Sequence, residues 1–558
     1  MARDDMDWWR GAVVYQVYPR SFLDTTGNGT GDLKGITQKL DYIASLGVDV
    51  VWLSPFFKSP MKDFGYDVSD YRDVDPLFGS LADFDELVAK AHGLGMRVLI
   101  DKVISHTSDQ HPWFQESRED RTNPKADWYV WADPKPDGTP PNNWLSIFGG
   151  PAWEWDTRRR QYYLHNFLAS QPDLNFHNPE VQDHILGELE FWLARGVDAF
   201  RLDACNYYFH DRELRDNPPA PADSFNTAAP PDNPYVFQSH RYCKSQPENL
   251  EFLRRLRALM ERYPGTFTMG EVGDDNSLDV MAAYTSGGDK LQMAYSFDLL
   301  TEQGSASYIR STVERLESRI GDGWPCWSMG NHDVARVVTR WGGENPHPRM
   351  ASVFAAMLLS LRGSACLYQG DELGLTEAEI PFEQLQDPYG IRFWPRWKGR
   401  DGCRTPMPWQ HDLPQAGFTT GTPWLPIPEE HRAMAVDVQE KDPDSVLASY
   451  RQFLQWRRQQ PALCVGDIVF FDAPENVLLF KRSAPEQQIL VAINLSGQTV
   501  DMPLNVEEVD VLSGHGFGGH LEQGRLVLPA WDAWYGDVSR AESVLLDTEG
   551  ATGPTAVE

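Results

Sequence analysis

The chain has 558 residues and a formal net charge of −31 at pH 7, and 41% of its residues are hydrophobic and 12% aromatic. This length exceeds what one compact core usually accommodates, so we expect two to four domains of a globular protein. The strong negative charge argues against binding to nucleic acid or to anionic membrane surfaces, although solubility alone would also account for it.

Six cysteines are scattered along the chain without a C-x-x-C pair or the spacing of a metal finger. We therefore expect reduced thiols in a reducing compartment. The first five residues are largely polar and lack an apolar stretch of signal-peptide length, and no run of about 18 apolar residues predicts a membrane span. Together these features predict a cytoplasmic protein.

Predicted strands and helices alternate along most of the chain. Apolar runs predict strands at 12–18, 48–53, 98–104, 197–204, 267–271, 292–297, 327–329 and 365–368. Helical patterns lie between most of these runs, as in the stripe of Ile36, Leu40, Ile43 and Leu46 that ends at Gly47. Strand–helix alternation repeated eight times predicts an α/β fold, a (β/α)₈ TIM barrel.

A glycine-punctuated loop follows the first predicted strand. Its oxygen-bearing side chains predict a structural Ca²⁺ or Mg²⁺ site, and they are Asp24, Thr26, Asn28, Thr30 and Asp32. With only two carboxylates, an Asx-rich turn that binds no cation explains the loop nearly as well.

Three segments do not follow the alternation. Residues 107–176 are too long for a loop and predict a small inserted domain after strand 3, while 375–444, rich in Pro and Trp, predict a lid after strand 8. Short alternating strands from 466 predict a C-terminal antiparallel β-sandwich domain. The predicted divisions are 1–106 and 177–374 for the barrel, 107–176 for the inserted domain, 375–444 for the lid, 445–465 for the end of the barrel, 466–538 for the β domain and 539–558 for a polar tail.

The loop Asn217–Pro234 lies between the fourth predicted strand and the next helix. It contains six prolines. We expect an exposed, semi-rigid loop that overhangs the acceptor side of any pocket formed at the strand ends.

The fourth predicted strand carries one guanidinium and one carboxylate. Strand side chains alternate between faces, so Arg201 and Asp203 project to the same side. A buried Arg favours the ionised form of a neighbouring Asp. A structural ion pair is the alternative, but the end of a strand is where a parallel barrel presents its chemistry. A fixed, ionised carboxylate can serve as the nucleophile in glycosyl transfer.

Other predicted strands also end in polar side chains. Asp101 and His106 follow the third strand, Glu271 ends the fifth, and His332 and Asp333 follow the seventh. Strand ends of one barrel share a face, so carboxylates and imidazoles should converge there.

The motifs at these strand ends resemble a known family. Asp101–His106 (DKVISH), Arg201–Asp203 (RLD), Glu271 and Asn331–Asp333 (NHD) are similar to the four signature regions of the α-amylase superfamily, glycoside hydrolase family 13. Gln171–Asn175 (QPDLN) resembles a motif of the branch that contains α-glucosidases and oligo-1,6-glucosidases. The resemblance extends over residues 8 to about 535, nearly the whole chain.

The resemblance implies roles for individual residues. Asp203 would be the nucleophile, Glu271 the general acid/base and Asp333 the transition-state stabiliser of a retaining enzyme. The implied substrate-binding residues are Asp63, Tyr66, His106, Phe148, Phe167, Arg201, Ala204, His332 and Arg400. At the position of Ala204, a small residue accompanies α-1,4 specificity in the family and Val accompanies α-1,6 specificity. In the cation loop, family members carry Asp-x-Asn-x-Asp where this chain has Asp-x-Thr-x-Asn.

The implied activity is that of an exo-acting α-glucosidase on short α-1,4-linked glucosides such as maltose, with transfer to sugar or alcohol acceptors. No cofactor is expected for catalysis, and neither nucleic acid nor a membrane is an expected partner. Alternatives are a transglucosylase, a sucrose- or α-1,6-specific member of the branch, and a non-catalytic sugar-binding relative. Both a monomer and a homodimer remain open.

Overall fold

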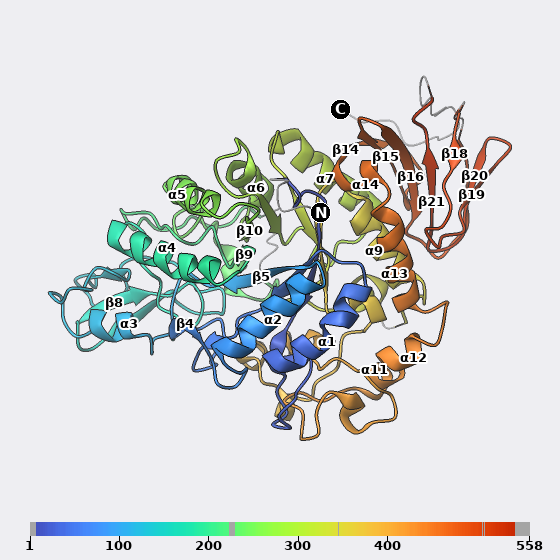
Figure 1. Ribbon diagram of the computed structural model, residues 1–558. Coiled ribbons are helices and arrows are strands. Elements are labelled where there is room, and N and C mark those ends of the chain that lie inside the picture. The colour runs from blue at the N-terminus through green and yellow to red at the C-terminus, as the bar shows by residue number, and fades with distance from the viewer. Residues whose placement is uncertain (1–6, 223–228, 344, 505, 507, 542–558) are drawn as a thin grey trace.

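The computed structural model of the chain describes residues 7–222, 229–343, 345–504, 506 and 508–541. Eight parallel strands form a barrel at the centre of the molecule (Figure 1). In spatial order they are β11 (Met293–Ser296), β10 (Phe267–Val272), β9 (Ala199–Leu202), β5 (Arg97–Lys102), β2 (Val50–Leu53), β1 (Val13–Val17), β13 (Ser364–Tyr368) and β12 (Cys326–Ser328). A parallel bridge between Ala294 and Pro325 joins the two ends of this order. The predicted TIM barrel is confirmed, and its strand ends differ from the predicted ones by two residues at most.

Helices surround the barrel. They are α1 (Leu33–Ser45), α2 (Leu81–Gly93), α4 (Pro179–Ala194), α5 (Asn249–Glu261), α6 (Ser277–Thr285), α7 (Ala306–Ile320), α8 (Val337–Gly342), α9 (Met350–Ser360) and α13 (Val446–Arg457), followed by the short α14 (Pro461–Val465). Their buried apolar side chains share one core with alternate residues of the barrel strands. No helix within the described ranges is both long enough and apolar enough to cross a membrane.

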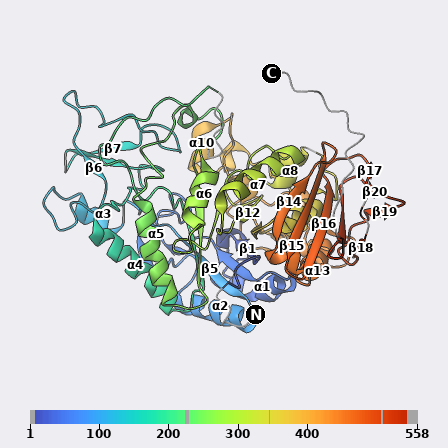
Figure 2. The ribbon, with the colours of Figure 1, turned by 90° about the horizontal axis from the view of Figure 1, so that it is seen from above.

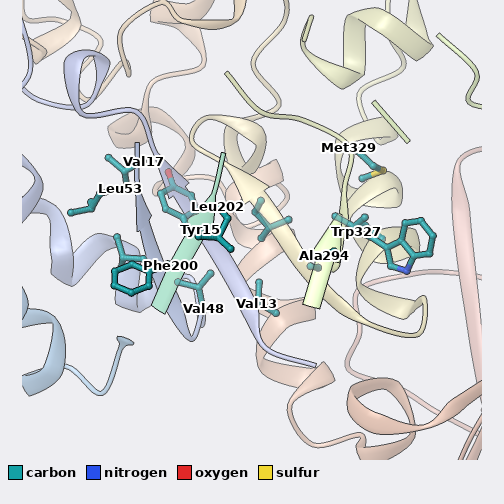
Figure 3. Close-up of a cluster of buried hydrophobic side chains, with 14 of the residues drawn as sticks. Val13, Tyr15, Val17, Val48, Leu53, Phe200, Leu202, Ala294, Trp327 and Met329 are labelled. Atoms are coloured by element: carbon teal, nitrogen blue, oxygen red, sulfur yellow. The ribbon is translucent and has the colours of Figure 1, made fainter. Parts of the chain in front are cut away.

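Alternation along β9 directs the polar side chains into the barrel. Phe200 and Leu202 belong to the core between the strands and the helices (Figure 3), whereas Ala199 belongs to a second core inside the barrel. Arg201 and Asp203 therefore project inward, as the alternation predicts, and their side chains are hydrogen-bonded to each other.

Two additions cover the C-terminal ends of the barrel strands. One follows β5 and holds α3 (Pro112–Ser117) and an antiparallel sheet of β6 (Trp131–Ala132), β8 (Gln161–Leu164) and β7 (Trp153–Asp156). The other follows β13 and holds α10 (Pro388–Phe393), α11 (Glu429–Ala433) and α12 (Val436–Gln439). The two additions meet where the rings of Phe148 and Tyr389 lie 4.8 Å apart. A smaller hairpin, β3 (Phe57–Lys58) and β4 (Asp70–Val74), follows β2.

A separate β domain packs on one side of the barrel (Figures 1 and 2). Its larger antiparallel sheet contains β14 (Asp467–Phe471), β15 (Val477–Ala484), β16 (Gln487–Asn494), β21 (Asp532–Asp537) and β18 (Asp510–Val511). Its smaller sheet contains β17 (Val500–Pro503), β20 (Arg525–Leu528) and β19 (His520–Glu522). Side chains from both sheets form one apolar core, so the predicted C-terminal β domain is confirmed. The sequence did not predict β17, β18, β19 and β21, and most of the expected polar tail lies outside the described residues.

Candidate active site

A cavity of about 810 Å³ lies at the C-terminal ends of the barrel strands. Its lining includes the predicted residues Asp63, Tyr66, His106, Phe148, Phe167, Asp203, Glu271, His332, Asp333 and Arg400. Two predicted site residues, Arg201 and Ala204, are not among the lining residues. Both instead contact Glu271 from beneath the cavity.

Arg201 is the centre of the buried charge network. Its Nη1 donates to Asp101 Oδ1 at 2.8 Å and to Asp203 Oδ1 at 2.6 Å, and its Nη2 donates to Glu271 Oε1 at 2.5 Å. The guanidinium is fully buried. Because neighbouring nitrogens of one group hold Asp203 and Glu271, the two carboxylates lie side by side.

Glu271 accepts hydrogen bonds at both of its carboxylate oxygens. The backbone N–H of Ala204 donates to Oε2 at 2.9 Å, while the Tyr295 hydroxyl donates to Oε1 at 3.2 Å. Ala204 has a φ of 42°, in the left-handed region that residues with a Cβ rarely adopt. This turn, directly after Asp203, aims the Ala204 N–H at Glu271.

The surroundings shift the pKa values of the two carboxylic acids. Burial raises the pKa of Glu271 to about 8, although Arg201 partly offsets this effect. Burial also raises the pKa of Asp203, against the opposing charge of Arg201, and Asp101 adds to the increase. The sequence predicted that Arg201 keeps Asp203 ionised; the direction of the Arg201 effect is as predicted, but the effect of burial outweighs it.

Asp333 has the opposite character. Burial opposes its ionisation, but the positive charges of Arg400 and Arg404 hold its pKa below the usual range. Arg400 Nη1 and Arg404 Nη2 donate to Asp333 Oδ1 at 3.1 and 3.2 Å. Burial lowers the pKa of His332 to about 3, so its imidazole is neutral at neutral pH. Asp333 is therefore a permanent negative charge in the cavity wall.

One end of the cavity is closed by charged side chains. Arg400 Nη2 donates to Asp63 Oδ1 at 2.9 Å and to Asp387 Oδ1 at 2.8 Å. Gln171 Nε2 donates to the other oxygen of Asp63 at 3.0 Å. The sequence motif containing Gln171 thus supports the pocket end from behind.

Aromatic rings and imidazoles form the remaining wall. Tyr66 stacks on His332 with ring centroids 5.1 Å apart, and Phe167 lies 5.8 Å from Phe148 and 5.2 Å from His106. His106 Nε2 lies 2.8 Å from the backbone oxygen of Tyr66, so this nitrogen already has a partner within the protein. Such walls offer apolar faces to the ring of a sugar.

Sequence reasoning missed several residues of the site, among them Asp387 and Tyr295. Asp387 holds Arg400 through both carboxylate oxygens, but it lies in an irregular segment without a motif. Tyr295 is the next-to-last residue of β11, the sixth barrel strand along the chain, and contacts both Arg201 and Glu271. The strand-end rule that found Glu271 would have found Tyr295 had it been applied to 292–297.

The described residues of the loop Asn217–Pro234 are exposed or half-buried, as predicted, except for one asparagine near each end. Asn217 and Asn233 are buried. The Asn217 N–H donates to Asn143 Oδ1 at 2.8 Å, and Asn233 Nδ2 donates to the backbone oxygen of Ile147 at 2.7 Å. Both ends of the loop are therefore fixed to the segment inserted after β5, because asparagine side chains pair with its polar groups. The described parts that line the cavity are 220–222 and 229–232.

The loop predicted to bind a cation is held by internal hydrogen bonds. Asp24 accepts the N–H groups of Thr26 and Gly29, and Asp32 accepts the N–H of Gly35 at the start of α1. Asn28 Oδ1 accepts the N–H of Thr30. Among the described residues, no group of three or more His, Cys, Asp or Glu side chains is arranged to hold a metal. These backbone N–H donors account for the conformation of the loop, and a cation bound to it stays a prediction.

The barrel, with its acidic groups at the strand ends, is the scaffold of a glycoside hydrolase. The family model of the alpha amylase catalytic domain matches residues 16–466. The chain belongs to the α-amylase family, glycoside hydrolase family 13, in its α-glucosidase branch.

Several relatives extend over nearly the whole chain. A probable alpha-glucosidase of Rhizobium meliloti (strain 1021) is 56% identical and covers 95% of this chain and 97% of its own length. An oligo-1,6-glucosidase of Heyndrickxia coagulans is 37% identical, with 88% and 93% covered. Among solved structures, the alpha-glucosyl transfer enzyme XgtA has 59% identity and a TM-score of 0.93, with 95% and 99% covered. The trehalulose synthase MutB of Pseudomonas mesoacidophila MX-45 has 33% identity and a TM-score of 0.86, with 95% and 99% covered.

Proposed function

We propose that this chain is a retaining, exo-acting α-glucosidase that releases glucose from the non-reducing end of short α-1,4-linked glucosides such as maltose. The observation that carries the proposal is the pair Asp203 and Glu271, held by adjacent nitrogens of Arg201 in the cavity. Two carboxyl groups held this close fit a retaining mechanism, whereas inverting enzymes separate them to admit a water molecule.

In the first step, Asp203 attacks the anomeric carbon of the terminal glucose. A bond forms between this carbon and a carboxylate oxygen as the glycosidic bond breaks, and Glu271 gives its proton to the departing oxygen. The raised pKa of Glu271 keeps that proton available at neutral pH. The ionised Asp333 stabilises the positive charge that develops on the sugar ring.

In the second step, water or another hydroxyl group attacks the same carbon. Glu271, now a carboxylate, removes the proton from the attacking oxygen, and Asp203 leaves. Each step inverts the configuration of the anomeric carbon, so the two steps together retain it. Neither step needs a cofactor, because the two carboxyl groups supply the nucleophile and the proton.

The closed end of the cavity favours exo-action, which is cleavage at the terminal sugar. The ion pair of Arg400 with Asp63, and the Phe148 ring below Arg400 at 5.1 Å, leave a terminal sugar facing charged hydrogen-bonding groups. The partly fixed loop Asn217–Pro234 also lines the cavity, and in this proposal it borders the acceptor side. Chains that continue past the closed end would collide with Arg400.

Transfer of glucose to sugar or alcohol acceptors is the second candidate function. The 59% identity to a structure described as an alpha-glucosyl transfer enzyme favours it. Both functions use the same glucosyl-enzyme and differ in the group that attacks it. For the chain we propose a cytoplasmic location, with monomer and homodimer both open.

Product chromatography on maltose, isomaltose, sucrose, trehalose and maltotetraose tests the proposal. We expect glucose to be released fastest from maltose, in the α-anomeric form when observed before mutarotation. If transfer products exceed free glucose at high acceptor concentration, the enzyme is mainly a transglucosylase under those conditions. Release of β-glucose would contradict retention, and turnover of none of the sugars would favour a non-catalytic relative.

A further inference from the structure

Tyr295 is a buried tyrosine inside the barrel, on the strand next to the one that carries Glu271. Tyr295 pairs directly with Glu271 in the register of β10 and β11, and only 1% of its surface is exposed. Its ring lies 6.4 Å from that of Trp52, which belongs to the same inner core. The hydroxyl is therefore fixed inside the barrel, next to Glu271, which lines the cavity.

The Tyr295 hydroxyl connects two members of the charge network. It accepts hydrogen bonds from Arg201 Nε at 3.0 Å and Nη2 at 2.8 Å. A phenol has one hydrogen, and a guanidinium has no acceptor, so that hydrogen goes to Glu271 Oε1 at 3.2 Å. The direction of this hydrogen bond is set by the chemistry of its neighbours.

We propose that Tyr295 is a positioning residue for the general acid/base, and that its hydroxyl stabilises Glu271 after the proton has left. This inference rests on the proposed function, because it needs Glu271 to act in proton transfer. A hydrogen bond to a carboxylate is stronger than one to a neutral carboxylic acid. The Tyr295 hydroxyl thus contributes more as negative charge develops on Glu271, which is the condition for lowering a barrier.

The proton itself moves only between Glu271 and the sugar oxygen. As the glycosidic bond breaks, the proton passes from Glu271 to the departing oxygen, and it is later replaced by one from the attacking hydroxyl. Tyr295 keeps its own hydrogen throughout. Its part is to hold the carboxylate and the Arg201 guanidinium in a fixed relative position.

A matched control distinguishes the proposed role of the Tyr295 hydroxyl from a purely structural role of its ring. Tyr208 is also 1% exposed and packs between aromatic rings, 4.8 Å from Phe176 and 5.6 Å from Phe252. Its hydroxyl has no hydrogen-bond partner among the described residues. The changes Tyr295→Phe and Tyr208→Phe therefore remove the same buried atom, once with partners and once without.

The test measures the pH profile of kcat/KM on maltose and on p-nitrophenyl α-glucoside for both variants. Removing a donor to the carboxylate raises the pKa of Glu271, so the alkaline limb of Tyr295→Phe should move up by about one pH unit. Its kcat/KM should fall about tenfold more on maltose than on the aryl glucoside, whose leaving group needs little protonation. Tyr208→Phe should leave both quantities as in the wild type.

The two readouts are the pH of the alkaline limb and the ratio of kcat/KM on the two substrates. Each is measured within one sample, so neither depends on the fraction of the protein that is folded. An unmoved or lowered alkaline limb, or equal losses on the two substrates, would overturn the role of Tyr295. If the wild-type enzyme cleaves no α-glucoside, the proposed function fails instead. An active wild type with an unaltered Tyr295→Phe variant refutes the positioning role alone.

Discussion

Arg400 and Asp63, which are 337 residues apart in the sequence, form an ion pair of 2.9 Å at the closed end of the cavity. Asp63 follows β2, and Arg400 lies in the segment after β13, so this pair connects the barrel to its covering segment. Arg400 Nη2 also donates to Asp387 Oδ1 at 2.8 Å. The end of the pocket that would hold the terminal sugar is thus built from long-range contacts.

The raised pKa values predict the pH dependence of the activity. Glu271 must be protonated to act as an acid, so kcat/KM should fall as the pH rises through its pKa of about 8. Asp203 must be ionised, and because burial raises its pKa, the acidic limb should lie above the ordinary range of an Asp. A pH profile of kcat/KM on maltose measures both limbs.

The variant Glu271→Gln is the control for the alkaline limb. Measured on an aryl glucoside, it should lack that limb, because the group that titrates has been removed. If the limb persists in this variant, another group is responsible for it.

The sequence predicted the barrel and the polar residues at its strand ends because those features have local signals, whereas their roles and most of the other binding residues were implied by the resemblance to the family. Buried apolar runs mark the strands, and the strand ends carry Asp203, Glu271 and Asp333. The partnership of Asp387 with Arg400 was not predictable, because it depends on how an irregular segment folds back over the barrel. The burial of Asn233 was missed for the same reason: proline content indicates stiffness, whereas exposure depends on distant partners.

Ala204, the residue after the proposed nucleophile, should influence linkage preference. Ala204→Val should reduce turnover of maltose more than that of isomaltose, with a change in their ratio of roughly ten- to two-hundred-fold, or about 1–3 kcal/mol. A β-branched residue is also strained at a φ of 42°, so a lower melting temperature is expected. Kinetics on both disaccharides and thermal unfolding provide the measurements.

Ala204→Gly is the matched control for this substitution. Glycine tolerates a positive φ and keeps the N–H that donates to Glu271, so its activity ratio should stay as in the wild type. A Val variant that loses both activities equally would mean that the residue only packs beneath the cavity.

The loop Asn217–Pro234 should limit the length of the substrate. Shortening it, or loosening it by Asn233→Ala, should raise the kcat/KM of maltotetraose relative to maltose. For Asn233→Ala, which loses donors to Ile147 and to the Tyr389 hydroxyl, we expect about a fivefold change, the effect of about 1 kcal/mol. Asn123, which is half-buried and does not line the cavity, provides a control, since Asn123→Ala should not alter the ratio. The same ratio in all variants would make the loop a surface feature only.

The cation predicted for residues 24–32 should affect stability but not chemistry. If the loop binds Ca²⁺ or Mg²⁺, exhaustive chelation lowers the melting temperature by a few degrees and either ion restores it, since binding to the folded state stabilises it. The rate per folded molecule should not change. An unaltered melting temperature would mean that the loop binds no cation. The hydrogen bonds to Asp24 would then be what stabilises the loop.

The covalent intermediate on Asp203 is the central claim. Glu271→Gln treated with α-glucosyl fluoride, which needs no acid, should accumulate a glucosyl-enzyme because the base for its hydrolysis is missing. Asp203→Asn, with unchanged circular dichroism, should lose more than a thousandfold in turnover, about 4 kcal/mol, and should form no adduct. The decisive measurement is peptide mass spectrometry of the quenched Glu271→Gln reaction. We predict one added anhydroglucose unit on the peptide at Asp203; an adduct on any other residue would contradict the account.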